Sequence, residues 1–293
     1  MKIEPINEND AAQRLDKFIL KLMPTLPKSM LYKGLRKNNV RLNGKHFHKG
    51  EYMLKEGDVL TLYFPDEFVR VKKSSEKLPS PCVVYEDDNI LVCNKPANLP
   101  SHADDKGSHD TLIGRILYYL EEKGEYSPES ENSFTPALCN RLDRNTRGLV
   151  IAAKNAKSLR ILNEKIRNRE IKKFYTAVCE GIFDKKEDTL CAGLTHGEKK
   201  SYVGENGDLK IQTHYKVISE KNNTSELEIE LLTGRTHQIR AHMAHIGHPL
   251  SGDVKYGAKK TDKGYSLVSC RIVFDFKSDA AELNYLKGKE IRL

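Results

Sequence analysis

Residues 139–153 read CNRLDRNTRGLVIAA and contain one carboxylate, Asp143, just ahead of an apolar run. Three arginines surround that carboxylate, namely Arg141, Arg144 and Arg147. The apolar residues 149–153 form the pattern of a buried strand, which would hold the preceding loop rigidly at one end of a sheet. An ordinary surface ion pair uses the same residue types and contributes little to stability. This segment alone therefore leaves a catalytic and a structural interpretation open.

Around this segment the sequence predicts more strands than helices. Helices are indicated over residues 111–122 and 157–168, and strands over residues 83–85, 90–93, 174–178, 212–217, 226–232 and 271–276. Residues 226–232 alternate leucine and isoleucine with glutamate, which is typical of an antiparallel strand with one exposed face. Because the helices do not alternate strictly with the strands, we expect an α+β fold with a mixed, mainly antiparallel sheet and flanking helices.

Two further basic segments lie where predicted strands begin or end. Lys172 and Lys173 precede the strand that contains Tyr175, and residues 233–240, TGRTHQIR, follow the strand at 226–232. Their side chains can therefore converge with the Asp143 loop at one end of the sheet.

The first 65 residues have the pattern of a separate small α+β domain. Apolar residues at Leu15, Phe18, Ile19 and Leu22 share one helical stripe. A second helix is expected from residue 29, where Ser29 can cap it, and Asn43-Gly44 indicates a tight turn after a strand at 40–42. Residues 66–81, DEFVRVKKSSEKLPSP, read as a linker, and residues 82–293 as the second domain.

Positive charge is concentrated in this first domain. The whole chain carries a formal charge of +8, yet residues 14–49 alone contain ten basic residues and a single acidic one, Asp16. A solvated basic face is the common explanation of such a run, but its density here favours contact with phosphates. The candidate RNA-binding residues of this domain are Arg14, Lys33, Arg36, Lys37, Arg41 and Lys45.

Several classes of protein and site are disfavoured by the sequence. No apolar run approaches the roughly 20 residues of a membrane helix, and the first ten residues, MKIEPINEND, lack a signal-peptide core, so we expect a cytoplasmic protein. The six cysteines are scattered without a CxxC pair, and the histidines at 237, 242, 245 and 248 lack the spacing of a zinc site. We therefore expect neither a metal nor another cofactor.

The motifs taken together resemble a known family. NRLDRNTRGLVI, at 140–151, is similar to the central motif of RluA-type pseudouridine synthases, commonly written HRLDxxTSG. YEDDNILVCNKPANLPSH, KKFYTAV and LLTGRTHQIRAHMAHIGHPLSGDVKYG resemble that family's other motifs, in the same order. The first domain resembles an S4 RNA-binding domain through RLDKFI, the basic helix, VRLNGK and GDVL.

The resemblance implies a role for four residues. Asp143 would be the catalytic nucleophile, and Arg141 would help displace the target base from its helix. Tyr175 would stack on the flipped uracil, and Arg235 would form the ion pair with Asp143. The implied reaction, conversion of uridine to pseudouridine in RNA, is a redox-neutral isomerisation. Members of the family with an S4 domain usually modify large-subunit ribosomal RNA, which is therefore favoured over transfer RNA as the substrate of a monomeric enzyme.

Three positions depart from the family pattern. Asn140 replaces the usual histidine, Arg147 a small serine, and Asn98 a glycine. Asparagine tolerates a left-handed backbone better than most residues, so the turn at Asn98 is expected to persist. Arg147 adds a positive charge to a loop that would face RNA, where it would affect the choice of substrate more than the chemistry.

Two alternative functions remain open from sequence alone. A non-catalytic RNA-binding or ribosome-assembly protein could retain the same fold and basic surface. A glycosidase with an aspartate nucleophile is less favoured, because such enzymes normally need a second carboxylate across the scissile bond, whereas the neighbours of Asp143 are arginines.

Overall fold

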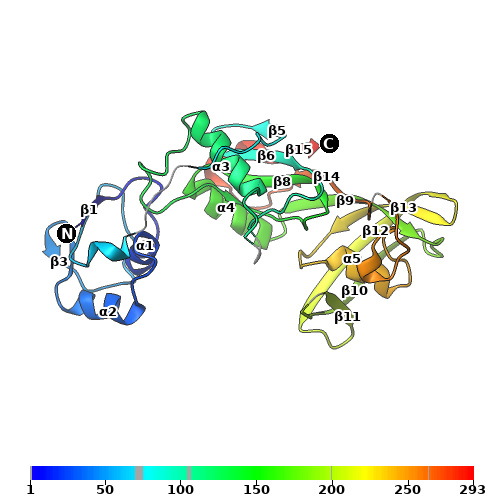
Figure 1. Ribbon diagram of the computed structural model, residues 1–293, viewed down its shortest axis with the longest axis horizontal. Helices are drawn as coiled ribbons and strands as arrows, with labels where there is room; N and C mark the ends of the chain where they lie inside the picture. Colours follow the sequence, from blue (N-terminus) through cyan, green and yellow to red (C-terminus); the bar gives the residue numbers. More distant parts are fainter. Residues whose placement is uncertain (1, 70–74, 104–106, 199, 263) are drawn as a thin grey trace.

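The computed structural model describes residues 2–69, 75–103, 107–198, 200–262 and 264–293. The chain forms an arch, with the N-terminal residues at one end and the strands β10 (Glu187–His196) and β12 (Leu209–Lys221) near the other (Figure 1). A large sheet occupies the centre. Among the described residues, no helix has both the length and the apolar character needed to cross a membrane.

The N-terminal module, residues 2–69, has its own sheet and its own apolar core. Its elements are β1 (Lys2–Pro5), α1 (Leu15–Leu22), α2 (Lys28–Arg36), β2 (Val40–Leu42), β3 (Lys45–His46) and β4 (Val59–Leu62). The strands are antiparallel in the order β1-β4-β2-β3. The predicted apolar stripe of α1 is buried in this core, together with Leu31 and Leu35 of α2.

Local details of this module agree with most of the predictions. The turn between β2 and β3 has positive φ angles at Asn43 and Gly44, 52° and 79°, as a tight hairpin requires. The proposed cap at Ser29 is wrong: α2 begins one residue earlier, at Lys28, directly after Pro27, whose fixed φ suits a helix start. Within the predicted linker, residues 66–68 form the short helix η1 (Asp66–Phe68), and residues 70–74 lie outside the described residues.

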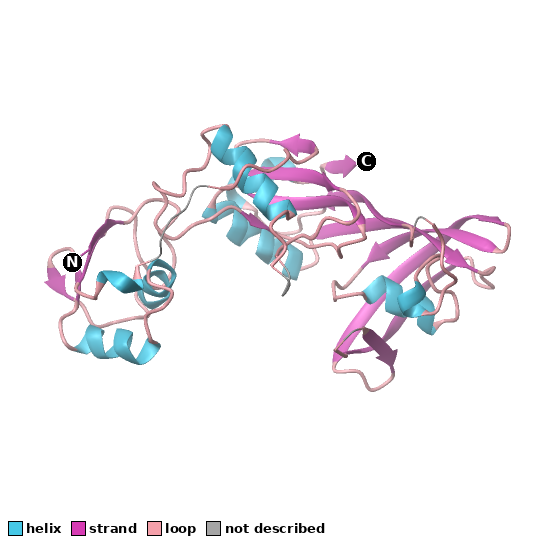
Figure 2. Cartoon of the chain, viewed as in Figure 1, coloured by secondary structure: helices cyan, strands magenta, loops and turns pink. Residues whose placement is uncertain are grey.

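Among the described residues, the central sheet has eleven strands, most of them antiparallel. Figure 2 shows its strands in magenta. Nine of them follow one another in the order β11-β10-β12-β13-β9-β14-β8-β6-β5. The remaining bounds are β5 (Val83–Glu86), β6 (Ile90–Lys95), β7 (Ala137–Leu138), β8 (Arg147–Ala153), β9 (Ile171–Glu180), β11 (Ser201–Gly204), β13 (Thr224–Leu231), β14 (Leu267–Phe274) and β15 (Glu290–Arg292). Because β8 and β14 run parallel, the sheet is mixed, which confirms the predicted α+β fold.

Two helices cover opposite faces of this sheet. α3 (Leu112–Glu122) packs against one set of alternate residues, including Leu91 and Val150, and α4 (Ala156–Arg167) packs on the side of the other set, including Ile90 and Ile151. This division follows from the period of two along a strand. α5 (Gln238–His245) contributes to the same core as α3, next to the strands β11 and β12.

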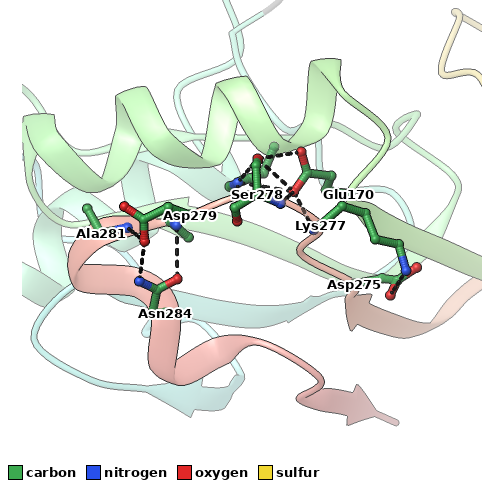
Figure 3. A network of polar contacts seen from close by, with 9 residues as sticks. Glu170, Asp275, Lys277, Ser278, Asp279, Ala281 and Asn284 are labelled. Atoms are coloured by element: carbon green, nitrogen blue, oxygen red, sulfur yellow. Dashed lines mark hydrogen bonds and ion pairs between the residues drawn. The ribbon is translucent and has the colours of Figure 1, made fainter.

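The turn from α4 into β9 is fixed by a buried carboxylate, Glu170 (Figure 3). Glu170 accepts hydrogen bonds from the backbone N–H groups of Lys277 and Ser278, at 2.7 and 3.1 Å, and from Lys165 Nζ at 3.0 Å. Burial alone would raise the pKa of Glu170, but these donors lower it to about 2. The carboxylate thus ties the start of β9, which carries Lys173 and Tyr175, to the segment after β14.

Candidate active site

Asp143 lies in the loop between β7 and β8, and the backbone on either side of it is held in place. Ser101 Oγ donates to the carbonyl of Leu142 at 2.8 Å. Lys95 Nζ donates to three carbonyls, those of Arg144 at 3.0 Å, Leu99 at 2.7 Å and Pro96 at 2.9 Å. The loop is therefore held at Leu142 by Ser101 and at Arg144 by Lys95, which lies on β6.

Lys95 is fully buried at the end of β6. Burial lowers the pKa of its ammonium to about 8, although the nearby charge of Asp143 acts in the opposite direction. Near neutral pH the lysine therefore keeps its charge and all three donors. In the sequence Lys95 appears only within YEDDNILVCNKPANLPSH, and that motif did not reveal its anchoring role.

The ion-pair partner of Asp143 is Arg240. Arg240 Nη1 lies 3.3 Å from Asp143 Oδ2, and His237 Nε2 lies 3.7 Å from the same oxygen. Arg240 is itself fixed by Asp253, which accepts from its Nε at 2.7 Å and its Nη2 at 2.9 Å. The guanidinium also lies between the rings of two tyrosines, 5.0 Å from the centroid of Tyr256 and 4.5 Å from that of Tyr265.

The expectation that Arg235 pairs with Asp143 is wrong in this structure. Arg235 is exposed, in the turn before α5. The backbone N–H of Arg235 donates to Oε1 of Gln238 at 3.2 Å. His237, two residues after Arg235, has a left-handed φ of 58°. The side chain of Arg235 is thus exposed to solvent, whereas that of Arg240 lies on the buried side of α5.

Tyr175 lies on β9 beside the same site. It is buried, and burial raises the pKa of its phenol. Lys173 is two residues earlier and so on the same face of the strand; burial lowers the pKa of its ammonium. Both side chains line one cavity with Asp143.

That cavity has a volume of about 620 Å³, which is within the usual range for small-molecule sites. Its walls come from the Asp143 loop, the end of α4, the start of β9 and residues 230–240. Seven cationic residues line it: Arg141, Arg167, Arg169, Lys172, Lys173, Arg235 and Arg240. Only two acidic residues, Asp143 and Glu230, accompany them. The cationic residues of the cavity thus outnumber the acidic ones, which suits a polyanion.

Within the part of the chain that the structure describes, no group of three or more His, Cys, Asp or Glu side chains is arranged to hold a metal ion. His242 and His248 instead contact Thr213 Oγ1 and the carbonyl of Glu180, at 3.0 and 2.9 Å.

Residues 89–245, more than half of the chain, match the family model of RNA pseudouridylate synthases. The chain belongs to this family. The synthase is 33% identical to the ribosomal large subunit pseudouridine synthase C of Vibrio cholerae, over 88% of its own length and 81% of the relative. Identity to the Escherichia coli protein of the same name is also 33%, over 90% and 82% of the two chains. An uncharacterized RNA pseudouridine synthase of Mycoplasma capricolum is 32% identical over 98% and 95%.

A solved structure gives the same result for the fold. Human RNA pseudouridylate synthase domain containing 1 superposes with a TM-score of 0.55 at 19% identity, covering 72% of the synthase and 83% of the human chain. The predictions of an RNA pseudouridine synthase and of an isomerase are confirmed by the family and its relatives.

The predicted RNA-binding residues of the synthase lie in two separate regions. Arg141 is exposed at the cavity. The others lie on the N-terminal module, where Lys33, Arg36 and Lys37 are exposed on α2 and just after it. Arg14, Lys45 and Arg41 complete that set; Arg14 pairs with Asp16 at 2.7 Å, Lys45 is exposed, and the guanidinium of Arg41 lies 5.5 Å from the ring centroid of Tyr63.

The three departures from the family motif have clear positions. Asn98 has a left-handed φ of 66°, so the prediction that the turn persists is confirmed. Asn140 Oδ1 accepts from the backbone N–H of Ile151 at 2.8 Å, which joins the Asp143 loop to β8. Arg147 is exposed at the start of β8.

Proposed function

We propose that the synthase isomerises uridines of large-subunit ribosomal RNA, with Asp143 as the nucleophile. The observation that carries this proposal is the Asp143–Arg240 pair at 3.3 Å within the cation-lined cavity. Arg240 fixes the orientation of this carboxylate, so that it can attack as a nucleophile. The choice of RNA is supported by relatives whose names specify the ribosomal large subunit.

The target nucleotide must leave its helical stack before it can enter the cavity. Unstacking costs a few kcal/mol, which stacking on an aromatic ring can offset. Tyr175 is the aromatic residue on the wall beside Asp143, and Arg141 at the cavity can take the place that the base leaves in the RNA. The exposed Arg235 contacts RNA phosphates in this scheme rather than the nucleophile.

The reaction breaks the N1–C1′ bond, turns the uracil and forms a C5–C1′ bond, with the proton lost from C5 balanced by one gained at N1. As a nucleophile, Asp143 bonds to the nucleotide when the N1–C1′ bond breaks, and this bond breaks again when C5 joins C1′. The cavity walls keep the detached uracil next to the sugar while it turns. Arg240 holds Asp143 in place throughout, because Asp253 fixes two of its other guanidinium nitrogens.

The N-terminal module is proposed to be an S4-like RNA-binding domain. Its exposed lysines and arginines would contact the phosphates of structured RNA, outside the cavity. In this proposal the module binds the RNA and the cavity catalyses the reaction.

The test is release of tritium from RNA labelled at uracil C5, with unmodified ribosomal RNA and transfer RNA as separate substrates. Wild-type protein is expected to release tritium from ribosomal RNA, and Asp143→Asn to lower the rate at least about a thousandfold. Asp184→Asn, which changes an exposed aspartate of the same domain, is the matched control. Release from transfer RNA alone would reassign the substrate. No release from either RNA, with RNA affinity intact, would favour a non-catalytic RNA-binding protein.

A further inference from the structure

The N-terminal module is joined to the catalytic part by a buried carboxylate, Asp10. Asp10 is 0% exposed. It accepts hydrogen bonds from Ser133 Oγ at 2.7 Å, Ser133 N at 3.2 Å and Asn132 Nδ2 at 2.8 Å. These donors lie in the segment between α3 and β7, more than 120 residues away in sequence.

Neighbouring side chains extend this contact on both sides. Gln13 Nε2 donates to Ser133 Oγ at 2.9 Å, and Asn9 Nδ2 donates to Glu131 Oε1 at 2.7 Å. Asn132 Nδ2 also donates to the carbonyl of Pro5, at 2.9 Å. We call Asn9, Asp10, Gln13 and residues 131–133 the Asp10 contact. Several directional hydrogen bonds in one place fix an orientation as well as a distance.

The same region of the module also contacts the start of α4. Asn9 Oδ1 accepts from the backbone N–H of Ala156, the first residue of that helix, at 3.0 Å. The N–H groups of a first helical turn have no partner within the helix, so this bond satisfies one of them. Arg160 Nη1, one turn further, donates to the carbonyl of Ala11 at 3.3 Å.

α4 connects this junction with the active site. Its twelve residues span roughly 18 Å. One end holds the module, and at the other end Ile166 and Arg167 line the cavity that contains Asp143. In Figure 1, α4 lies between the N-terminal module and the far end of the arch. Since a helix of this length is stiff, α4 sets the distance between the module and the cavity wall.

We propose that the Asp10 contact positions the basic face of α2 relative to the cavity, so that one structured RNA is held at both places at once. Asp10 and Ser133 are thus positioning residues, which act through Lys33, Arg36 and Lys37. The inference rests on the proposed RNA-binding role of the module. Two tethered sites in a fixed geometry bind the same RNA far more tightly than either does alone, because the second contact becomes intramolecular.

The experiment compares variants from both sides of the Asp10 contact. Asp10→Ala acts within the module, and Ser133→Ala acts from the catalytic part without altering the core of the module. Both are expected to raise KM for a structured ribosomal RNA fragment about tenfold and to leave kcat within about twofold. Ser133→Thr keeps the hydroxyl and should restore much of the affinity. Glu8→Ala makes the same change in charge as Asp10→Ala, two residues away at an exposed position, and should change neither constant.

A short hairpin that reaches only the cavity provides the internal control. With this substrate the Asp10 and Ser133 variants should match wild type. A fall in kcat on both substrates would contradict the proposal, since the contact would then support the fold of the cavity. Melting of each variant by circular dichroism separates loss of position from loss of the module.

The variant Lys33→Ala/Arg36→Ala separates failure of this inference from failure of the proposed role of the module. If that variant raises KM and the Asp10 and Ser133 variants do not, positioning is overturned and RNA binding by the module stands. If none of the variants changes KM, both the positioning role of the Asp10 contact and RNA binding by the module are overturned. A rise in KM from the Asp10 and Ser133 variants alone would also overturn the inference, because α2 would then not be what the contact positions.

Discussion

Arg240 binds two carboxylates, but it makes two hydrogen bonds to Asp253 and one to Asp143. Its Nε and Nη2 are committed to Asp253, and Nη1 alone reaches Asp143. The arrangement depends on the planar fork of a guanidinium, which an ammonium cannot reproduce. Arg235, in the same TGRTHQIR segment, has no such constraint because it is exposed.

Arg240→Lys is therefore expected to lower kcat about a hundredfold, the size of effect seen when one preorganised donor is lost. Arg235→Lys, the matched change at the exposed arginine, should leave kcat within a few fold. Single-turnover tritium release measures both. A larger loss of kcat at Arg235 than at Arg240 would return the ion-pair role to Arg235.

Lys95 gives a prediction about pH. Its pKa is about 8 in the folded protein and 10.5 ordinarily, so between these values the unfolded chain binds more protons than the folded one. Stability from this group must then rise with pH across that window. Relative to Lys95→Met, wild type should gain about 2 kcal/mol in free energy of unfolding between pH 7 and pH 9.5. Urea denaturation at both pH values tests this, and a difference that shrinks with pH would contradict it.

At the scale of elements, the strands that carry the site were predictable and those at the β11 end of the sheet were not. β8 is indicated by five successive apolar residues and β13 by its alternation, and β9 was expected at 174–178. β10 and β11 were missed, and β12 is much longer than the predicted 212–217. Most of β10 is not buried, so pairing with β12 rather than its own apolar pattern stabilises it, and such context is invisible in a single sequence.

The parallel pairing of β8 with β14 depends on Gly148. Its φ is 121°, and a Cβ at this position would lie 2.3 Å from the carbonyl oxygen of Ser269 on β14. Gly148→Ala should therefore destabilise the synthase by at least about 3 kcal/mol, through backbone strain and overpacking together.

Thermal or urea unfolding measures this loss. Gly204→Ala on β11 is the control, because a Cβ there would meet nothing within 4 Å. Equal stability of the two variants would show that β8 and β14 can separate without loss, contrary to the expectation.

At the scale of the whole molecule, the composition correctly indicated a concentration of positive charge in the first 65 residues. It did not indicate how that region packs against the rest of the chain. The cavity forms a second basic region, built from segments that only the fold brings together. The Asp10 contact could not be predicted either, since residues 131–133 are polar loop residues without periodicity. Its hydrogen bonds form only when the N-terminal module packs against the segment between α3 and β7, and no local sequence pattern predicts that packing.

Binding of RNA at two basic regions should make affinity strongly dependent on salt. Each lost phosphate contact reduces the slope of log affinity against log salt by about one, so Lys33→Ala/Arg36→Ala should reduce it by roughly two. Lys221→Ala/Lys287→Ala removes two exposed lysines that do not line the cavity and should leave the slope unchanged. Fluorescence anisotropy across a salt series gives both slopes, and equal slopes for the two variants would contradict this assignment.

The position of β14 has a consequence for the order in which the synthase can become active. β14 lies between β8, which follows Asp143, and β9, which carries Tyr175. Asp143, Tyr175 and Arg240 all precede it in the chain, so a nascent polypeptide holds every one of these residues before residue 267 is translated. Until β14 leaves the exit tunnel and inserts, the two halves of the site have no strand to join them. The synthase therefore gains its activity only after residue 274, the end of β14, has been made.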